Sequence, residues 1–182
     1  MITPNFDHNN VIPPHTGDPT SPQDVSPYKC DSLELCKRFA TSPQRNKLLL
    51  GLLDFRQQLA EFGILEGFQW LDGSFLENIE VSQNRSPNDI DVVTFFIDNG
   101  LDVDTVFKEF PEFIYAEKSK STYGLDHYPV DFGHKPELTV ESSRYWIQLF
   151  SHNRLGIWKG MIRLELNTPT IDLEALNYLK QL

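Results

Sequence analysis

The chain has 182 residues, of which 40% are hydrophobic and 12% aromatic, and its formal net charge is −10. That length suffices for one domain with a full hydrophobic core, and the aromatic content excludes a disordered chain. The negative charge repels a phosphate backbone, so we expect no non-specific DNA binding. A nucleotide held through a divalent cation remains compatible with it.

The cysteine content and the hydropathy of the chain indicate the cellular compartment in which we expect the protein. Cys30 and Cys36 are too few for a disulfide framework, and no second Cys or His pair has the spacing of a zinc site. No secretory signal pattern and no apolar run of the ~20 residues needed to cross a bilayer is present. We therefore expect a soluble, cytoplasmic protein that does not associate with a membrane.

The N-terminal segment, residues 1–28, holds six of the 12 prolines. Proline fixes φ and removes a backbone donor, so this segment is predicted to be extended and non-helical. Whether it forms a loose tail or an arm lying across the domain stays open. We divide the chain into this Pro-rich arm and a domain over 29–182.

Two helices are predicted next. Asp31 and Glu34 form a capping-box pattern for a short helix over 31–40. Ser42, followed by a proline, predicts the start of a longer amphipathic helix that stops at Gly63.

The rest of the chain mixes strands and helices irregularly. The predicted elements are strand 67–72, a Gly-Ser turn, a loop over 79–88, strand 89–97, helix 104–113, strand 128–132, helix 140–150, strand 158–166 and a final helix from Asp172. Strand 89–97 is apolar on both faces after its two Asp, which is typical of a covered central strand. The pattern predicts an α/β (α+β) fold with a mixed central sheet flanked by helices.

The strongest candidate site is the pair Asp89 and Asp91 at the start of strand 89–97. Residues two apart on a strand share a face, so the two carboxylates lie side by side and repel each other unless a cation or proton intervenes. Such an oxygen-rich pair suits Mg²⁺. A solvated strand end is the alternative. Asp131, between apolar residues of strand 128–132, would complete a three-carboxylate cluster if its strand lies beside 89–97; otherwise it faces solvent.

Candidate phosphate ligands come from two segments. Gly73 permits close backbone approach, and Ser74 can donate a hydrogen bond to phosphate at a turn entering a helix. Arg154 and Lys159, in a cationic and aromatic segment near the C-terminus, could hold a triphosphate or offset its developing charge. Ordinary turns are the alternative for both segments. Asp72, which would repel phosphate, is predicted to be structural.

These residues resemble the signature of the DNA polymerase-β-like nucleotidyltransferase superfamily: an apolar residue, Gly-Ser, a spacer, an Asp-apolar-Asp strand and a later carboxylate. Here these are Leu71, Gly73-Ser74, Asp89 to Val92 and Asp131. The chain departs from the signature in having Asp72 directly before the glycine and a slightly long spacer.

Nearly the whole chain also resembles a family of small uncharacterised bacterial nucleotidyltransferase-like proteins (DUF6932-like). The shared elements are Pro13 to Asp18, Ser26 to Tyr28, Trp70 to Phe75, the Asp-Ile-Asp-Val-Val strand and Trp158 to Met161. This resemblance implies that the N-terminal arm belongs to the domain.

The superfamily resemblance implies a polymerase-β-like fold, Mg²⁺ or Mn²⁺ on Asp89 and Asp91, and an NTP substrate held by Gly73-Ser74. It also implies that Asp131 helps an acceptor hydroxyl to attack the α-phosphate. Small bacterial members modify tRNA ends, proteins or antibiotics, or act in toxin–antitoxin and phage-defence loci.

Two hypotheses follow. The first is a nucleotidyltransferase that moves NMP from NTP to a hydroxyl of a protein, RNA such as tRNA, or small molecule. The second is an inactive nucleotidyltransferase-like binding module, an antitoxin or defence component. Homo-oligomers and complexes with a partner protein are open under both.

Overall fold

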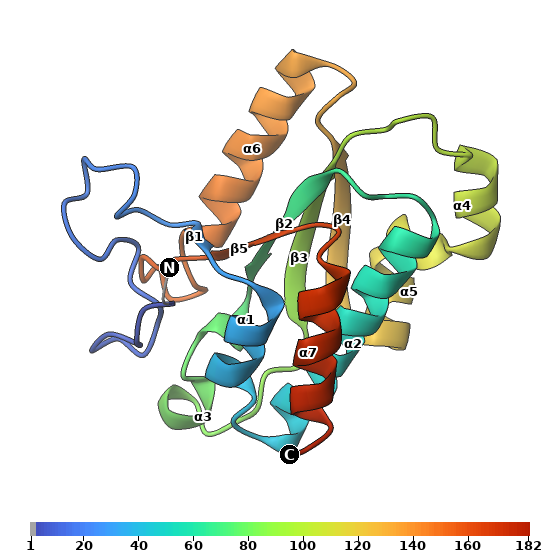
Figure 1. The fold of residues 1–182 in the computed structure, drawn as a ribbon. Helices are drawn as coiled ribbons and strands as arrows, with labels where there is room; N and C mark the ends of the chain where they lie inside the picture. Colours follow the sequence, from blue (N-terminus) through green and yellow to red (C-terminus); the bar gives the residue numbers. More distant parts are fainter. Residues whose placement is uncertain (1–2) are drawn as a thin grey trace.

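The computed structural model describes residues 3–182, in which five strands form one mixed sheet of order β1-β5-β2-β3-β4 (Figure 1). β2 is antiparallel to both β3 and β5, whereas β1 is parallel to β5 and β4 is parallel to β3. The elements are β1 (Tyr28–Lys29), α1 (Ser32–Phe39), α2 (Pro43–Glu61), β2 (Gly67–Asp72), η1 (Ser74–Leu76), α3 (Ile79–Ser82), β3 (Ile90–Phe96), α4 (Val103–Glu109), η2 (Pro111–Phe113), α5 (Ala116–Tyr123), β4 (Leu125–Asp131), α6 (Pro136–Phe150), β5 (Ile162–Glu165) and α7 (Pro169–Leu179).

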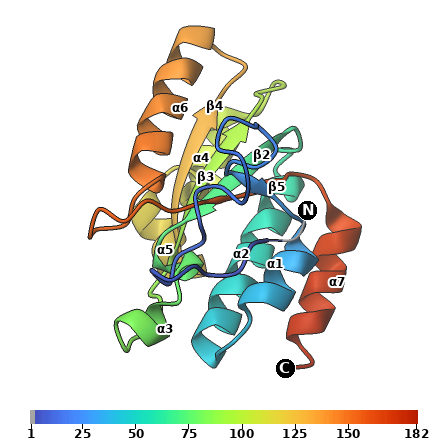
Figure 2. The ribbon, with the colours of Figure 1, turned by 90° about the vertical axis from the view of Figure 1, so that its left-hand side faces the viewer.

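Helices cover the sheet unequally. Figure 2 shows α1, α2 and α7 together on one side of the strands and α6 alone on the other. The fold class expected from the sequence, a mixed sheet flanked by helices, is therefore confirmed at this level.

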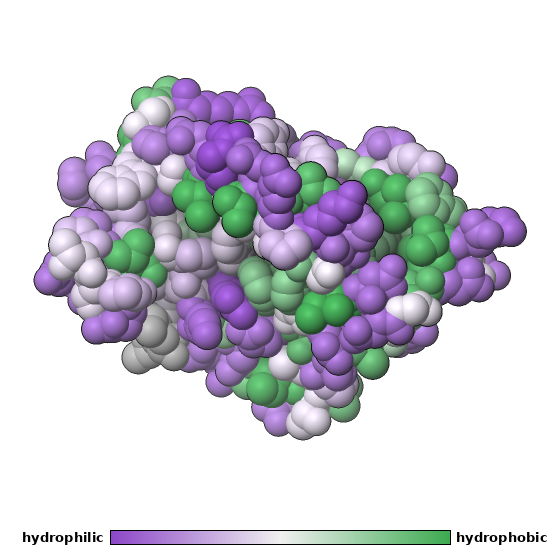
Figure 3. All heavy atoms as spheres, turned by 90° about the horizontal axis from the view of Figure 1, so that it is seen from above, coloured by the Kyte–Doolittle hydropathy of each residue, from purple (hydrophilic) through white to green (hydrophobic). Residues whose placement is uncertain are grey.

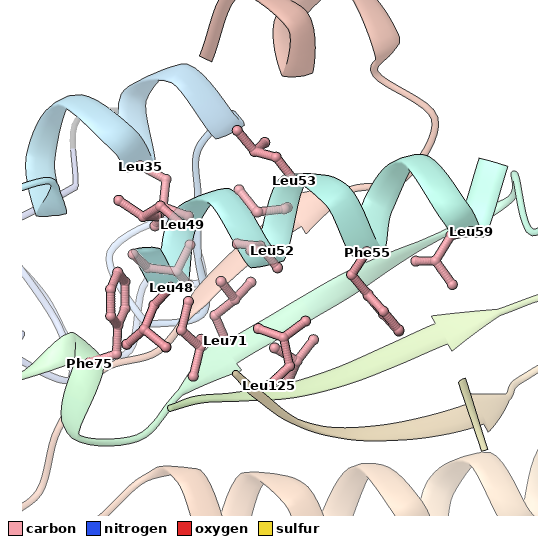
Figure 4. Close-up of a cluster of buried hydrophobic side chains, with 14 of the residues drawn as sticks. Leu35, Leu48, Leu49, Leu52, Leu53, Phe55, Leu59, Leu71, Phe75 and Leu125 are labelled. Atoms are coloured by element: carbon pink, nitrogen blue, oxygen red, sulfur yellow. The ribbon is translucent and has the colours of Figure 1, made fainter. Parts of the chain in front are cut away.

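The larger core lies under α2. Leucine and phenylalanine side chains at helical spacing on α2 point toward the sheet, where Leu71 of β2 and Leu125 of β4 meet them (Figure 4). The predicted caps define the ends of the first two helices: Asp31 and Glu34 close a full capping box, and the Ser42 hydroxyl accepts from Arg45 N–H. Local signals and core packing thus agree for the first third of the chain.

β3 is buried on both faces, as its apolar pattern predicts. Ile90, Val92 and Phe96 join the core under α2, whereas Val93 and Phe95 join a smaller cluster under α6. Side chains alternate across a strand, so Asp91 lies on the α6 face.

Several predicted bounds were wrong. The segment 79–88 is not all loop, because α3 occupies its first residues, and the helix α5 was not predicted. α5 ends at Gly124 with φ of +73°, and β4 begins directly after it, three residues earlier than expected. β5 is shorter than the predicted strand 158–166, and α6 begins before residue 140.

The N-terminal segment lies across the domain. Val11 and Ile12 are fully buried, and the Ile12 carbonyl accepts a hydrogen bond from Gly160 N–H. Asn10 carbonyl accepts another from Asn78 N–H, beyond the Gly-Ser turn. The described part of the arm, from residue 3, contains no helix, in agreement with its proline content.

The face seen from above is largely hydrophilic (Figure 3). Seen from above, hydrophobic residues form small separate groups between polar ones (Figure 3). α6 is an exception, since five large apolar side chains on it are exposed: Leu138, Val140, Tyr145, Ile147 and Leu149. Among residues 3–182, none of the helices combines the length and the apolar character needed to cross a membrane.

Candidate functional site

Three neighbouring strands bring three carboxylates into one row. The register pairs Asp72 of β2 with Asp91 of β3, and Asp91 with Asp126 of β4. All three side chains lie on the α6 face, because Trp70 and Val93, two residues away on their strands, pack into the cluster under that helix. Adjacent strands are about 4.8 Å apart, so the carboxylates are close neighbours.

Asp89 lies beside this row of carboxylates, at its partly exposed side. It directly precedes β3, and its side chain is 17% exposed. Lys120 of α5 reaches it, with 2.5 Å between Nζ and Oδ2, while the lysine side chain itself stays 52% exposed. An exposed lysine on a flexible stem can leave at little cost. Lys120 therefore marks a position next to Asp89 at which a cation is favoured.

Asp91, in the middle of the row, is destabilised in its charged form. Burial first, and then the charges of Asp89 and Asp126, raise the pKa of Asp91 to about 6. Lys159 and Lys120 act in the opposite direction without cancelling this effect. A carboxylate held in this way gains from a nearby cation, because the cation removes the repulsion that protonation would otherwise relieve.

Asp72, at one end of the row, forms a buried ion pair with Lys159. Their atoms Oδ1 and Nζ are 2.7 Å apart, and Nζ also donates to the Gly73 carbonyl at 3.0 Å and lies 3.5 Å from Glu77 Oε1. Burial raises the pKa of Asp72 to about 7, although Lys159 lowers it. The prediction of a structural role for Asp72 agrees with this geometry.

Gly73 is where the chain passes closest to Asp91. Its φ is +83°, and a Cβ at this position would lie 2.2 Å from Asp91 Oδ2. Its N–H faces the Asp72 carboxylate, and its carbonyl accepts from Lys159. Only glycine is compatible with both the backbone conformation and the contact.

Asp131, the predicted third carboxylate, does not join the row. Its strand does lie beside β3, but the register places Asp131 opposite Phe96, about 17 Å along the strand from Asp91. Its carboxylate accepts from Gly133 N–H at 2.9 Å. The position beside Asp91 belongs to Asp126.

Sequence reasoning missed Asp126 because it began this strand at Tyr128. The signal that could have found it is the alternation from residue 125 onward: Leu125 and His127 are fully buried, whereas Asp126, Tyr128 and Val130 point to the other face. A left-handed glycine before Leu125 marks the strand start.

The predicted cationic ligands are placed differently from one another. Lys159 is 2% exposed and bound to Asp72, so its ammonium does not reach the surface of the row. Arg154 lies on the exposed turn between α6 and β5. Ser74 is half-buried at the start of η1, next to Gly73.

Two cavities lie away from the carboxylates. One of about 260 Å³ lies between α2 and α7, and one of about 290 Å³ lies beside β1. Arg56 borders both, and its guanidinium is engaged with Asp172, Gln69 and Thr168. This network joins α2, β2 and α7, and we assign it to the stability of the fold.

Comparison with known proteins gives one match, to a family model described as a family of unknown function, DUF6932, over residues 4–165. The chain belongs to this family. No curated protein and no solved structure matches it. The DUF6932 match includes most of the N-terminal arm and all five strands, and it ends before α7.

The carboxylates of this row are hard oxygen donors, the donor type that Mg²⁺ prefers. Within residues 3–182, no three Asp, Glu, His or Cys side chains converge tightly enough to cage an ion. Mg²⁺ usually takes only one or two carboxylates, and substrate phosphates and water complete its octahedron. Asp89 and Asp91 offer hard oxygen donors of this kind, and burial together with the charges of Asp89 and Asp126 raises the pKa of Asp91.

Proposed function

We propose that this protein is a Mg²⁺-dependent nucleotidyltransferase that moves NMP from an NTP to an acceptor hydroxyl. The observation that carries the proposal is the row of carboxylates, in which Asp91 lies between Asp126 on the next strand and the backbone of Gly73. The order Gly-Ser turn, Asp-x-Asp strand and a third carboxylate on a parallel strand also supports a polymerase-β-like fold as the finer assignment.

Asp89 and Asp91 would hold the metal, which, when bound, stabilises charge on the phosphate oxygens of the NTP. Metal binding to these residues requires two changes. Lys120 must move away from Asp89, and Asp91 must lose its proton. The two carboxylates thus set the position of the α-phosphate relative to the strand ends.

Asp126 would take the place that the sequence suggested for Asp131. In the proposed reaction, the acceptor oxygen forms a bond to the α-phosphorus, and the bond between that phosphorus and the oxygen bridging to the β-phosphate breaks. The acceptor proton passes to Asp126, and pyrophosphate leaves. Asp126 lies on the same face as Asp91 and directly beside it, as this role requires.

Gly73 and Ser74 would position the remaining phosphates. The missing side chain at Gly73 opens the approach to Asp91, and the Ser74 hydroxyl can donate to a phosphate oxygen. The net charge of −10 favours a protein or small-molecule acceptor over generic RNA, because a polyanion is repelled unless a local basic patch holds it.

The test is transfer of label from each α-labelled NTP, with Mg²⁺ and cell lysate as the source of acceptors. We expect labelled protein, RNA or small molecule with the wild type, and loss of label with Asp91→Asn and Asp126→Asn. Asp131→Asn is the control, since it makes the same change on the same strand, but on the opposite face of β4 and far from the row. Equal transfer by Asp126→Asn and wild type would refute the role of Asp126.

A non-catalytic binding module is the second candidate, and the pairing of Lys120 with Asp89 favours it, because an internal cation already satisfies one carboxylate. This candidate predicts a melting temperature that does not respond to Mg²⁺ with NTP. A Mg²⁺-dependent rise that Asp91→Asn abolishes, together with label transfer, would exclude it.

A further inference from the structure

An exposed pair of tyrosines continues the carboxylate row along the sheet. Tyr128 lies two residues after Asp126 on the same face of β4, which places it about 7 Å further along the strand. Tyr145 comes from α6, and both rings pack on Trp146 with centroid distances of 4.9 Å. Tyr128 is 39% and Tyr145 54% exposed, so each ring keeps an open surface.

We propose that Tyr128 and Tyr145, backed by Trp146, form the surface on which the nucleobase of the substrate NTP stacks. This inference rests on the proposed function, because it takes the position of the phosphates from Asp89 and Asp91. The tyrosine surface would be the part of the chain that distinguishes a nucleotide from other polyphosphates.

Three features favour a nucleobase over other occupants. The tyrosine surface is continuous with the carboxylates, so a ligand whose phosphates meet Asp91 extends over Tyr128 across roughly the length of a ribose. The surface is aromatic with polar edges, and every base has a π-face that stacks on such rings. Trp146 is 8% exposed and holds the two rings in place, so little ordering is needed on binding.

The Tyr128 phenol also interacts electrostatically with the carboxylates of the row. Burial, followed by the charge of Asp126 and a hydrogen bond to it, raises the pKa of Tyr128, to which Asp91 and Tyr145 contribute further. Tyr128 therefore lies next to the carboxylate that we propose as the proton acceptor, two positions away on the same face of β4. A base stacked here would place its sugar next to Asp126.

The test compares two ligands that each carry three phosphates, of which only one also carries a nucleoside. Binding of an ATP analogue with a methylene bridge between its α and β phosphorus atoms, which cannot be transferred, is measured by calorimetry with Mg²⁺. Binding of inorganic tripolyphosphate is measured in parallel. We expect the wild type to bind the ATP analogue about tenfold more tightly, which is the size of one base–aromatic stack.

Substitution then locates the effect. Tyr145→Leu and Tyr128→Leu keep an apolar side chain but remove the ring, and each is expected to weaken the ATP analogue about fivefold to tenfold without changing tripolyphosphate. Tyr115→Leu is the matched control, because Tyr115 is 40% exposed and packs edge-on against Phe107 away from the row. Both rings are exposed, so their removal leaves the core intact. Thermal melting verifies that each variant folds.

The outcomes separate this inference from the proposed function. Equal affinity of the wild type for both ligands, or equal losses for both in Tyr145→Leu, overturns the tyrosine surface while leaving phosphate binding in place. Failure to bind either ligand overturns the proposed function and this inference together. Quenching of tryptophan fluorescence by the ATP analogue but not by tripolyphosphate, lost in Trp146→Phe, supports the inference independently.

Discussion

Asp91→Asn should stabilise the folded protein at neutral pH, because the carboxylate costs stability where it lies. The pKa of Asp91 rises from 3.8 to about 6, which is about two pKa units and corresponds to about 3 kcal/mol at ~1.4 kcal/mol per unit. Relaxation of the surroundings reduces this, so we expect a gain of about 1–3 kcal/mol. The removed charge also relieves Asp72, in the same direction.

The sign of the pH dependence follows from the raised pKa. Between about pH 4 and pH 6 the folded chain keeps a proton on Asp91 that the unfolded chain has lost, so the wild type loses stability as the pH rises. Asparagine does not titrate. The difference between variant and wild type should therefore be near zero at pH 4 and reach its full size above about pH 6.

Urea unfolding followed by circular dichroism, in EDTA and at several pH values, measures this difference. For a chain of this length, 1–3 kcal/mol corresponds to a rise in melting temperature of about 3–10 °C. Asp131→Asn, the same change at the far end of β4, should change the stability by less than about 0.5 kcal/mol. An Asp91→Asn variant that is no more stable than wild type at pH 7.5, or a difference independent of pH, would refute the reasoning.

Three further predictions concern the surroundings of Asp91. Lys159→Met should cost about 3–5 kcal/mol of unfolding free energy in urea, because it leaves Asp72 buried without its partner, and adding Asp72→Asn should recover most of this. Gly73→Ala should destabilise more than Gly100→Ala in thermal melting. A Cβ at Gly73 would lie 2.2 Å from Asp91 Oδ2, and the backbone there, with φ of +83° and ψ of −171°, is in a region almost exclusive to glycine, whereas a Cβ at Gly100 meets nothing within 4 Å. Lys120→Ala should tighten Mg²⁺ binding severalfold by calorimetry, since it removes the competing cation, and unchanged affinity would contradict that competition.

Much of the fold could be predicted from the sequence, because it depends on interactions between residues close together in the chain. The capping box at Asp31, the serine cap before α2 and the two apolar faces of β3 depend on residues a few positions apart, and the structure agrees with each. The same-face arrangement of Asp89 and Asp91 follows from the period of a strand, whatever lies beside it. Glycine at 73 likewise signalled a special backbone conformation.

Other features required contacts between distant parts of the chain. Asp126, rather than Asp131, stands beside Asp91 because the pairing of β4 with β3 begins directly after Gly124, and a pattern within one strand does not reveal its register against another. The pairing of Lys159 with Asp72 joins segments 87 positions apart in the chain. Lys159 was predicted to be a phosphate ligand, but in the structure it is the buried counter-ion of Asp72.

The sequence by itself therefore determined which side chains could form a metal and nucleotide site, because side-chain chemistry and strand period are local properties. Only the tertiary structure decided which of them meet. Strand register, the packing of α6 on the sheet through Trp146 and the contact of Lys120 with Asp89 all depend on elements that are separate in the chain.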